Sequence, residues 1–496
     1  MGSLTELATK SSSTGRKWRL AVHCRIGTGI GDISLLTPSS SMDDLWLILE
    51  PAVRRRTLKD FTIMEGFVPN RNGILSLRIG IDATTWLSEP NITLDDICYR
   101  LCRVLGLSVT AIFFFDVPAT RHPLAAPFNA LVKAFGFYSC LICVRNITNP
   151  FRLMVVQAKG DVVIELACLN RIGALDLIFT IEAEAFVLGA THVVYSPQEN
   201  DYGEAAIYTY NNIRKYTSLS RGGLLLFCLL LGGKYNDGLA GCTEGIAYTL
   251  ARCGLGDTLL LAVQTLSAPE LATYLTLWRA DLREELDEAD KTSEMIADVS
   301  DGFPDLNAVR VYVCETPSIN HDAALWIPRA PNLTSLRRLW GRYFQWRSVA
   351  SIPSGFLVAF ITAVCVRRLS EPCNEMEALQ RHLLQDIVVE AVPPLSSFLA
   401  ICGHTRTVFK VEVFVASIVA GICEGTGPPS AKIRVNVPRQ ILAHALPLLV
   451  QHYEEHLPVE RRAPAKYYRP QQTHNVAVTS VRGDSVPEYI RELSFM

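Results

Sequence analysis

Short, mostly apolar runs alternate with helical patterns in the first half of the chain. Residues 77–83 (LRIGIDA) and 109–115 (VTAIFFF) are rich in β-branched and aromatic residues, as strands buried on both faces of a parallel sheet are. Residues 94–105 lie between them with helical periodicity, and a third apolar run covers residues 174–180. The alternation predicts an α/β domain with a parallel sheet flanked by helices.

Acidic residues accompany each of these runs. Asp82 and Asp116 end or directly follow the first two. Glu182 and Glu184 follow the third, and Asp161 precedes an apolar segment that is predicted to be a buried helix. The carboxyl ends of parallel strands form the usual ligand site of an open α/β sheet. Because a buried carboxylate needs a partner, the spacing predicts a cation site at this edge.

The pattern becomes helical after residue 221. A Leu-rich segment (222–233) leads into a glycine-rich turn (GGKYNDGLAGCTEG, 232–245). A second helical stretch (246–252) and a long charged helix (266–290) follow. These segments predict a helical region after the sheet domain.

Strand patterns return near the C-terminus. Apolar and charged residues alternate over residues 409–415, and a second run over 433–437 precedes an amphipathic segment from 440 to about 456. Strands followed by a helix predict a small C-terminal α+β module. Residues 1–41 and 458–496 lack such patterns and are predicted to be a flexible extension and a loose tail.

The composition is that of a folded protein of more than one domain. At 496 residues, 49% hydrophobic and 19% charged, the chain is too long for one ordinary core. Its apolar runs are shorter than the roughly 20 residues that cross a bilayer, so no membrane partner is expected. The 14 cysteines are scattered around one CxxC, Cys140 to Cys143, which favours reduced thiols in an intracellular protein over a zinc site.

The net charge of −2 provides no global field for nucleic acid. Any such contact must therefore rest on local basic clusters, each of which is more often a solvated face than a phosphate clamp. The clusters are Arg54–Arg56 with Lys59; Arg337, Arg338, Arg342 and Arg347; and Arg461, Arg462, Lys466 and Arg469.

The ordered motifs of the chain resemble the XPG/flap-endonuclease family, most closely its Holliday-junction-resolvase-like branch in fungi. The resemblance covers roughly residues 43–290. The matching pieces are DLWLILEPA (44–52), LRIGIDATTWL (77–87), FFFD (113–116), AFGF (134–137), ELACLNRIGALDLIFT (165–180), GGKYNDGLAGC (232–242) and LARCGLGD (250–257).

The resemblance implies a PIN-like parallel sheet built from the XPG N and I regions, over residues 42–221. Residues 139–155 are predicted to be at least partly inserted. A helix–two-turn–helix and helical region would follow over 222–370, and a chromodomain-like module over 400–457. In such a fold two Mg²⁺ ions activate water and stabilise displacement at a phosphodiester. The matching catalytic and metal-binding positions are Asp82, Asp116, Asp161, Glu182 and Glu184.

Two departures from the family pattern affect this metal site. Val163 replaces the second glutamate of the family's E-A-E motif; Glu165, one turn from Asp161, either leans in or has a solvated or hydrogen-bonded role. Lys234 replaces the aspartate of a GGDY-type motif. An ammonium about 4 Å from a divalent ion would cost about 8 kcal/mol at an effective dielectric near 20, unless the long side chain turns outward.

Two further departures affect DNA contacts. The segment after the second metal aspartate, 117–133, is short, and its candidate phosphate ligands are Arg121 and Lys133. An ordinary surface connection is an equally good interpretation. The glycine turn keeps Gly238 and Gly241 as candidate DNA-binding positions, but Thr243 replaces the next glycine, where close approach of a phosphate needs one.

Three functions follow for testing. The first is a Mg²⁺-dependent structure-specific DNA endonuclease of DNA repair, acting in the nucleus on flapped DNA or Holliday junctions, with a dimer on DNA as an open option. The second is a catalytically inactive relative that binds DNA or a protein partner. The third is a PIN-like scaffold without affinity for nucleic acid. The family motifs favour the first, whereas Val163 and Lys234 favour the second.

Overall fold

The computed structural model describes the chain in stretches. The described residues are 41–66, 76–83, 94–115, 145–195, 204–289, 299–313, 326–344, 346–370, 387–388, 408–414, 416–423, 432–447 and 450–451. The predictions made for Asp116, Arg121 and Lys133 lie outside them, as do those for residues 1–40 and for the tail 458–496.

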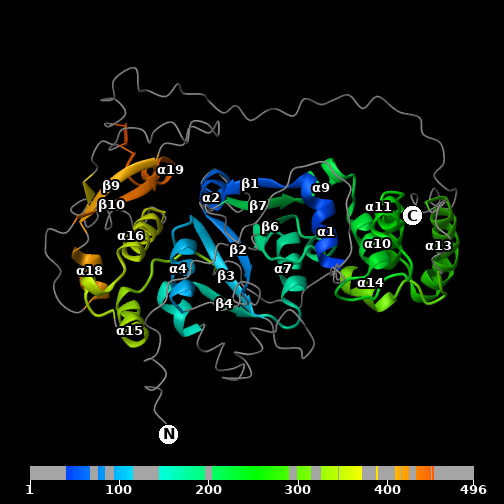
Figure 1. Ribbon diagram of the computed structural model, residues 1–496, viewed down its shortest axis with the longest axis horizontal. Coiled ribbons are helices and arrows are strands. Elements are labelled where there is room, and N and C mark those ends of the chain that lie inside the picture. The colour runs from blue at the N-terminus through cyan, green and yellow to red at the C-terminus, as the bar shows by residue number, and fades with distance from the viewer. Residues whose placement is uncertain are drawn as a thin grey trace, which may run out of the picture.

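A seven-stranded mixed sheet forms the centre of the molecule (Figure 1). Its strand order is β1-β7-β6-β5-β2-β3-β4, with β2 to β6 parallel and with β7 and β1 antiparallel at one edge. The strands are β1 (Arg54–Thr57), β2 (Leu77–Asp82), β3 (Val109–Phe115), β4 (Met154–Gln157), β5 (Leu177–Phe179), β6 (His192–Tyr195) and β7 (Glu204–Thr209). The predicted fold class, a largely parallel sheet flanked by helices, is confirmed.

The third predicted strand is shorter than its apolar run. Strand β5 covers Leu177–Phe179 rather than 174–180. The backbone N–H groups of Ala174 and Leu175 instead donate to the Leu169 carbonyl and close the end of the preceding helix, 2.9 and 3.2 Å away. The first apolar residues of the run therefore belong to a helix-capping turn.

The pleat of β3 divides two hydrophobic cores. Phe113 and Phe115 belong to one core and Ile112 and Phe114 to the other, because successive side chains of a strand point to opposite faces. All four are buried, which explains why the run shows no polar alternation.

One face of the sheet is covered by helices that lead into the helical region at the right of Figure 1. Gly222 and Gly256 let α10 and α12 touch, since a Cβ on Gly256 would lie 2.0 Å from the Gly222 carbonyl oxygen. These helices are α7 (Val162–Arg171), α8 (Glu184–Val187), α10 (Arg221–Leu231), α11 (Glu244–Leu250), α12 (Leu255–Thr265), α13 (Ala268–Ala289) and α14 (Leu306–Val313).

The opposite face carries helices that join the sheet to the C-terminal module. Helix α4, predicted at residues 94–105, is confirmed and packs against α16. These helices are α2 (Leu58–Gly66), α4 (Leu94–Leu105), α15 (Leu333–Tyr343) and α16 (Ser354–Leu369), with short 3₁₀ turns η3 (Asn149–Phe151) and η5 (Val349–Ser351).

The C-terminal module is a three-stranded antiparallel sheet of order β10-β9-β8 with two helices. Phe409 and Val411 are buried, as their alternation predicts. Within the predicted segment 440–456, α19 covers Arg439–Ala445, and helical backbone returns at residues 447 and 450–451; the other residues of the segment lie outside the described ones. The elements are β8 (Ile387–Val388), β9 (Val408–Phe414), α18 (Ala416–Ile422), β10 (Lys432–Pro438) and α19 (Arg439–Ala445).

The first described helix fixes the loop after β5. Helix α1 (Ser41–Leu49) and the 3₁₀ turn η1 (Glu50–Ala52) lie near α9 (Tyr210–Thr217). Trp46 packs on Tyr195 and Tyr208, and its indole N–H donates to the Ile181 carbonyl over 2.6 Å. Ile181 directly precedes Glu182, so this contact positions a predicted site residue.

Two sequence expectations concern thiols and membranes. None of the eight cysteines within the described stretches forms a disulfide, and most are buried, as predicted. Within those stretches no single helix has the length and apolarity to cross a bilayer. Only α11 and α12 taken together, bent by 64°, meet those two criteria.

Candidate functional site

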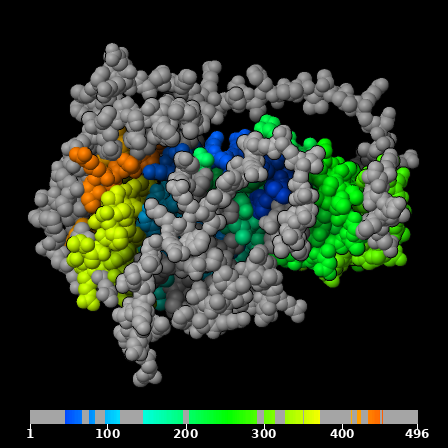
Figure 2. Space-filling model, viewed as in Figure 1, coloured from blue at the N-terminus to red at the C-terminus, as the bar shows by residue number. Residues whose placement is uncertain are grey.

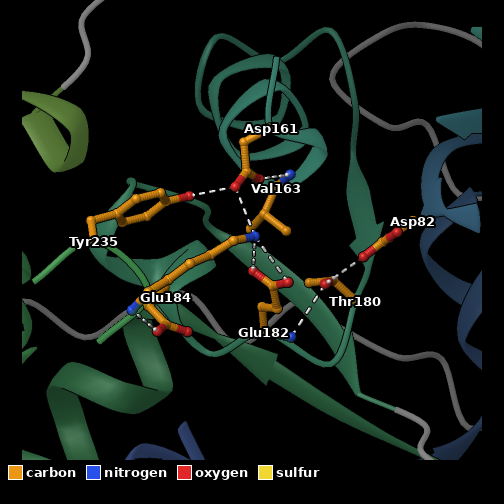
Figure 3. Close-up of polar contacts among 8 residues, drawn as sticks. Asp82, Asp161, Val163, Thr180, Glu182, Glu184 and Tyr235 are labelled. Atoms are coloured by element: carbon orange, nitrogen blue, oxygen red, sulfur yellow. Dashed lines mark hydrogen bonds and ion pairs between the residues drawn. The ribbon is translucent and has the colours of Figure 1, made fainter. Parts of the chain in front are cut away.

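The acidic residues meet where the strand order of the sheet reverses. The chain runs from β2 outward to β3 and β4 on one side, and from β5 to β6 and β7 on the other. Such a switch point leaves a crevice at the carboxyl ends of the two central strands. Asp82 ends β2, and Glu182 follows β5 by three residues, so both lie at this crevice (Figure 3).

Thr180 links Asp82 to the loop that carries Glu182. The Thr180 hydroxyl donates to Asp82 Oδ2 over 3.4 Å and accepts from the Glu182 backbone N–H over 3.2 Å. Asp82 is 3% exposed and Glu182 is 8% exposed. The strand end and the loop are therefore held together by a buried hydroxyl.

Asp161 enters the site from the N-terminus of α7. Its side chain caps that helix by accepting from the Val163 backbone N–H over 2.9 Å. Its other oxygen accepts from the Tyr235 hydroxyl over 2.8 Å. Because a helix N-terminus favours negative charge, this position stabilises an ionised carboxylate.

Lys234 bridges two of the predicted metal ligands. It lies in a tight turn that Gly233 and Asn236 close by a 2.9 Å backbone hydrogen bond. Its Nζ is 2.7 Å from Asp161 Oδ2, and 2.9 and 3.1 Å from the two oxygens of Glu182. The side chain is 14% exposed. The ammonium therefore points into the site and does not turn outward.

The protonation states of Asp161, Glu182 and Lys234 depend on one another, because a single ammonium lies among several buried carboxyls. Burial raises the pKa of Glu182 to about 8, with Lys234 opposing the rise and the charges of Asp161 and Asp82 adding to it. Burial also disfavours a charged Asp161, but Lys234 and Tyr235 hold its pKa below the ordinary value. For Lys234, the two carboxylates outweigh burial and raise its pKa. At neutral pH the ammonium therefore pairs with an ionised Asp161, while the raised pKa of Glu182 keeps most of that carboxyl protonated.

Glu184 is buried beside the turn that carries Lys234. One oxygen accepts from the Lys234 backbone N–H over 3.4 Å, and burial raises the pKa of its carboxyl. Its other oxygen, the Tyr312 hydroxyl and Asn236 Oδ1 have no hydrogen-bond partner among the described residues. A Cβ on Gly233 would lie 2.8 Å from the Tyr312 hydroxyl and 3.5 Å from Glu184, so glycine is required there.

Val163 and Glu165 both lie on α7, close to the N-terminus that Asp161 caps. Val163 is buried and brings a methyl surface where the family pattern has a carboxylate. Glu165 accepts from the Lys159 backbone N–H over 3.1 Å and so shapes the loop before the helix. The hydrogen-bonded role is thus confirmed for Glu165.

The described residues do not fit a pair of Mg²⁺ ions. Lys234 already contacts the carboxylates of both Asp161 and Glu182. A divalent ion bound between these two carboxylates would therefore lie directly beside the ammonium, which repels it. Within the described part of the chain, no group of three or more His, Cys, Asp or Glu side chains has the arrangement of a metal site.

The glycine-rich turn between α10 and α11 has the backbone that its glycines imply. Gly238 and Gly241 both adopt φ of +82°, in the left-handed region. Thr243, where the family pattern has glycine, caps α11 by accepting from the Ile246 backbone N–H. The substitution thus stabilises the helix start. The part of Gly238 and Gly241 in DNA binding stays a prediction.

Tyr235 and Thr180 are site residues that sequence patterns did not single out. Tyr235 directly follows Lys234, and its hydroxyl fixes Asp161; Thr180 precedes the Ile181–Glu182 loop. A polar residue next to a substituted ligand position was the available signal for Tyr235. No spacing rule indicates Thr180.

Together these features define an α/β fold of the XPG nuclease type with an acidic site that holds an internal cation. Similar solved structures agree on the fold. The chain matches the eukaryotic junction-resolving enzyme GEN-1 bound to sodium, with a TM-score of 0.64 and 19% identity over 83% of this chain and 99% of that one. A second match is GEN1 in complex with product DNA and a Mg²⁺ ion, with a TM-score of 0.61 and 18% identity over 82% of this chain and 98% of that one.

The human relative has the same fold. Human GEN1 in complex with Holliday junction DNA matches with a TM-score of 0.54 and 16% identity, over 83% of this chain and 97% of that one. The predicted resemblance to the XPG nucleases is thus confirmed at the level of the fold. Placement in a fungal branch stays a prediction.

Curated sequences give a shorter match. Single-strand DNA endonuclease 1 of Arabidopsis thaliana is 22% identical over 250 residues, which cover 44% of this chain. The chain spans about two-fifths of that relative's length, 39%. The rice protein of the same name is 22% identical over 253 residues, which cover 44% of this chain and 37% of the relative. No family model matches the sequence.

Proposed function

We propose that this chain binds branched DNA through an XPG-type nuclease fold and has lost two-metal cleavage. The proposal joins the fold, which is that of junction-resolving enzymes, to a site whose chemistry differs from a metal-dependent nuclease. Similar structures contain Holliday junction or product DNA, which supports branched DNA as the partner.

The observation that carries the proposal is the position of the Lys234 ammonium. Two-metal hydrolysis needs two divalent ions roughly 3.5–4 Å apart, held by carboxylates that are free to ligate them. Here Nζ lies within 3.1 Å of three carboxylate oxygens from Asp161 and Glu182. An ammonium can neutralise these groups, but it cannot polarise water as a divalent ion does.

Cleavage and binding assays on the same DNA test the proposal. Labelled four-way junctions and flaps are incubated with the full chain in EDTA, Mg²⁺ or Mn²⁺, and binding is followed by fluorescence anisotropy in EDTA. We expect bound DNA in EDTA and uncut DNA under all three conditions. The control is Asp82→Ala, which alters the strand-end carboxylate without touching the Lys234 pairs.

Cleavage by the wild-type protein that Asp82→Ala abolishes would contradict the proposal. It would favour the second candidate, a structure-specific endonuclease that uses Mg²⁺ held by Asp82, Asp116, Asp161, Glu182 and Glu184. One observation favours that candidate: the structure brings the strand-end carboxyl of Asp82 and the two glutamates to one crevice. Absence of DNA binding would instead favour the protein-binding scaffold.

The proposal extends to location and assembly. A protein that recognises branched chromosomal DNA acts in the nucleus, and a junction with two equivalent arms offers room for two copies. Imaging of the tagged full chain and sedimentation with and without junction DNA test these two points.

A further inference from the structure

The charges of the molecule are separated between its two ends. Helices α15 and α13 lie at opposite ends of the long axis (Figure 1). Residues 326–370, which include α15 and α16, contain seven arginines and no lysine, aspartate or glutamate. Helix α13 contains six carboxylates against two arginines. The net charge of −2 therefore conceals a basic end and an acidic end.

Helix α15 is a rigid support for the basic end. Leu336 and Trp340 are fully buried, and the Trp340 ring meets Phe356 and Phe360 edge-on at 5.4 and 4.9 Å. Asn332 caps the helix by accepting from the Ser335 backbone N–H over 3.0 Å. Its backbone N–H in turn donates to Pro150 over 2.8 Å. The helix is thus fixed at its start and along one side, in the part of the molecule that Figure 2 shows in yellow-green.

The other side of α15 presents the arginines. Arg338 and Arg342 are exposed and one turn apart, which is about 6 Å along the axis. No described residue forms an ion pair with either. Gly341 lies between them with open space where a Cβ would be, so the helix surface there is bare. The Arg342 guanidinium stacks 5.4 Å from the centroid of the Tyr343 ring, which is 46% exposed.

We infer that this arginine face, Arg338 and Arg342 with Tyr343, binds the phosphate backbone of a duplex DNA arm. The inference rests on the proposed function and names a surface for it outside the acidic crevice. Unpaired arginines on a rigid helix suit phosphates, because the guanidinium offers several donors and loses little freedom on binding. The bare backbone at Gly341 lets a phosphate approach between the two side chains.

The inference predicts a definite salt dependence. Each phosphate neutralised contributes about −0.9 to the slope of log K against log salt concentration for duplex DNA. The double variant Arg338→Ala/Arg342→Ala should therefore bind with a slope that is less steep by about 2. At 0.1 M salt the same relation gives a loss of roughly tenfold in affinity for each contact removed.

The test is a titration of a labelled four-way junction and a linear duplex by fluorescence anisotropy, from 50 to 200 mM salt and in EDTA. A second variant, Arg338→Lys/Arg342→Lys, keeps both charges and should keep most of the slope. The matched control is Arg214→Ala/Lys215→Ala on α9. It also removes two exposed cations, although these are adjacent in the sequence and not one turn apart, and Lys215 lies 5.0 Å from the ring centroid of the half-exposed Tyr216.

The outcomes separate the arginine face from the proposed function. Loss of affinity and slope in the α15 alanine variant alone, with circular dichroism unchanged, supports the inference. An equal loss in the α9 control would show an effect of net charge only and overturn it. Unchanged binding by the α15 variant would overturn the arginine face and leave the proposed function standing. A wild-type chain that binds neither DNA would overturn both.

Discussion

Replacing Lys234 by methionine is the most direct test of the internal cation. Methionine keeps most of the length and apolar stem of lysine but removes the ammonium. The change leaves Asp161 with only the Val163 N–H and the Tyr235 hydroxyl, and it leaves Glu182 without its charged partner. Both carboxyls stay largely buried.

The distances set the size of the effect. At an effective dielectric near 20, each ion pair at 2.7–2.9 Å is worth about 6 kcal/mol before desolvation. Desolvation offsets several kcal/mol per ion, and removal of one partner of a buried pair costs about 3–5 kcal/mol. Because Glu182 can take up a proton in place of the ammonium, we expect the low end, about 3 kcal/mol at pH 8.

The loss should depend on pH with a definite sign. Glu182 binds its proton more tightly in the folded chain, where its pKa is about 8 against an ordinary 4.5, so its contribution to stability falls as pH rises between these values. Asp161 behaves oppositely: its lowered pKa contributes stability above the ordinary value, and this contribution is lost with Lys234. The difference between wild-type and variant should therefore be small near pH 4 and widen toward pH 8.

Thermal unfolding followed by intrinsic fluorescence at pH 5 and pH 8 measures this difference. A loss of about 3 kcal/mol corresponds to a fall of roughly 6–12 °C in unfolding temperature, for a cooperative unit of 150–250 residues. The control is Lys215→Met on the exposed face of α9. The reasoning is refuted if Lys234→Met has the unfolding temperature of the wild-type protein at pH 8, or if the unfolding temperature of the control falls as far as that of Lys234→Met.

Three other expectations can be checked on the same instrument. The wild-type unfolding temperature should be equal in EDTA and Mg²⁺, whereas Lys234→Ala should gain several degrees from Mg²⁺, because the freed carboxylates then lack a cation. Gly238→Ala should unfold well below Gly254→Ala. Both require a left-handed backbone costing about 1–2 kcal/mol, but only at Gly238 would the new Cβ meet backbone, 2.6 Å from the Gly232 nitrogen. Trp46→Phe should cost about 1–2 kcal/mol in unfolding free energy, through the lost hydrogen bond to Ile181 and reduced packing.

The sequence predicted three of the seven strands, β2, β3 and β5, because these form distinct apolar runs; β1, β4, β6 and β7 were not predicted. Strands β2 and β3 are buried on both faces, so their apolar runs mark their bounds closely. Strand β5 was predicted too long, since the helix-capping turn at Ala174 has the same apolar composition as a strand. Apolar periodicity reports burial, but it does not report which backbone partner a residue chooses.

The sequence predicted which residues form the candidate site, but not the contacts that those residues make with one another. Their positions at strand ends predicted Asp82 and Glu182 as site residues. The family motif predicted that Lys234 lies where a metal-binding aspartate is expected. The direction of the Lys234 side chain could not be predicted, because it depends on the tight turn that Asn236 closes and on the Tyr235 hydroxyl that holds Asp161 in reach. Both are tertiary features with no spacing of their own.

A lysine at this position changes what the acidic crevice can do while keeping the fold intact. Four carboxyls brought to one sheet edge repel one another, and a metal-dependent site relies on bound ions to relieve that repulsion. Here the relief comes partly from the ammonium and partly from protonation of Glu182 and Glu184, both of whose pKa values are raised. Since neither source needs a soluble ion, the fold can persist without metal. The proposed recognition of DNA then rests on surfaces outside the crevice, where Arg338 and Arg342 of α15 have no ion-pair partner among the described residues.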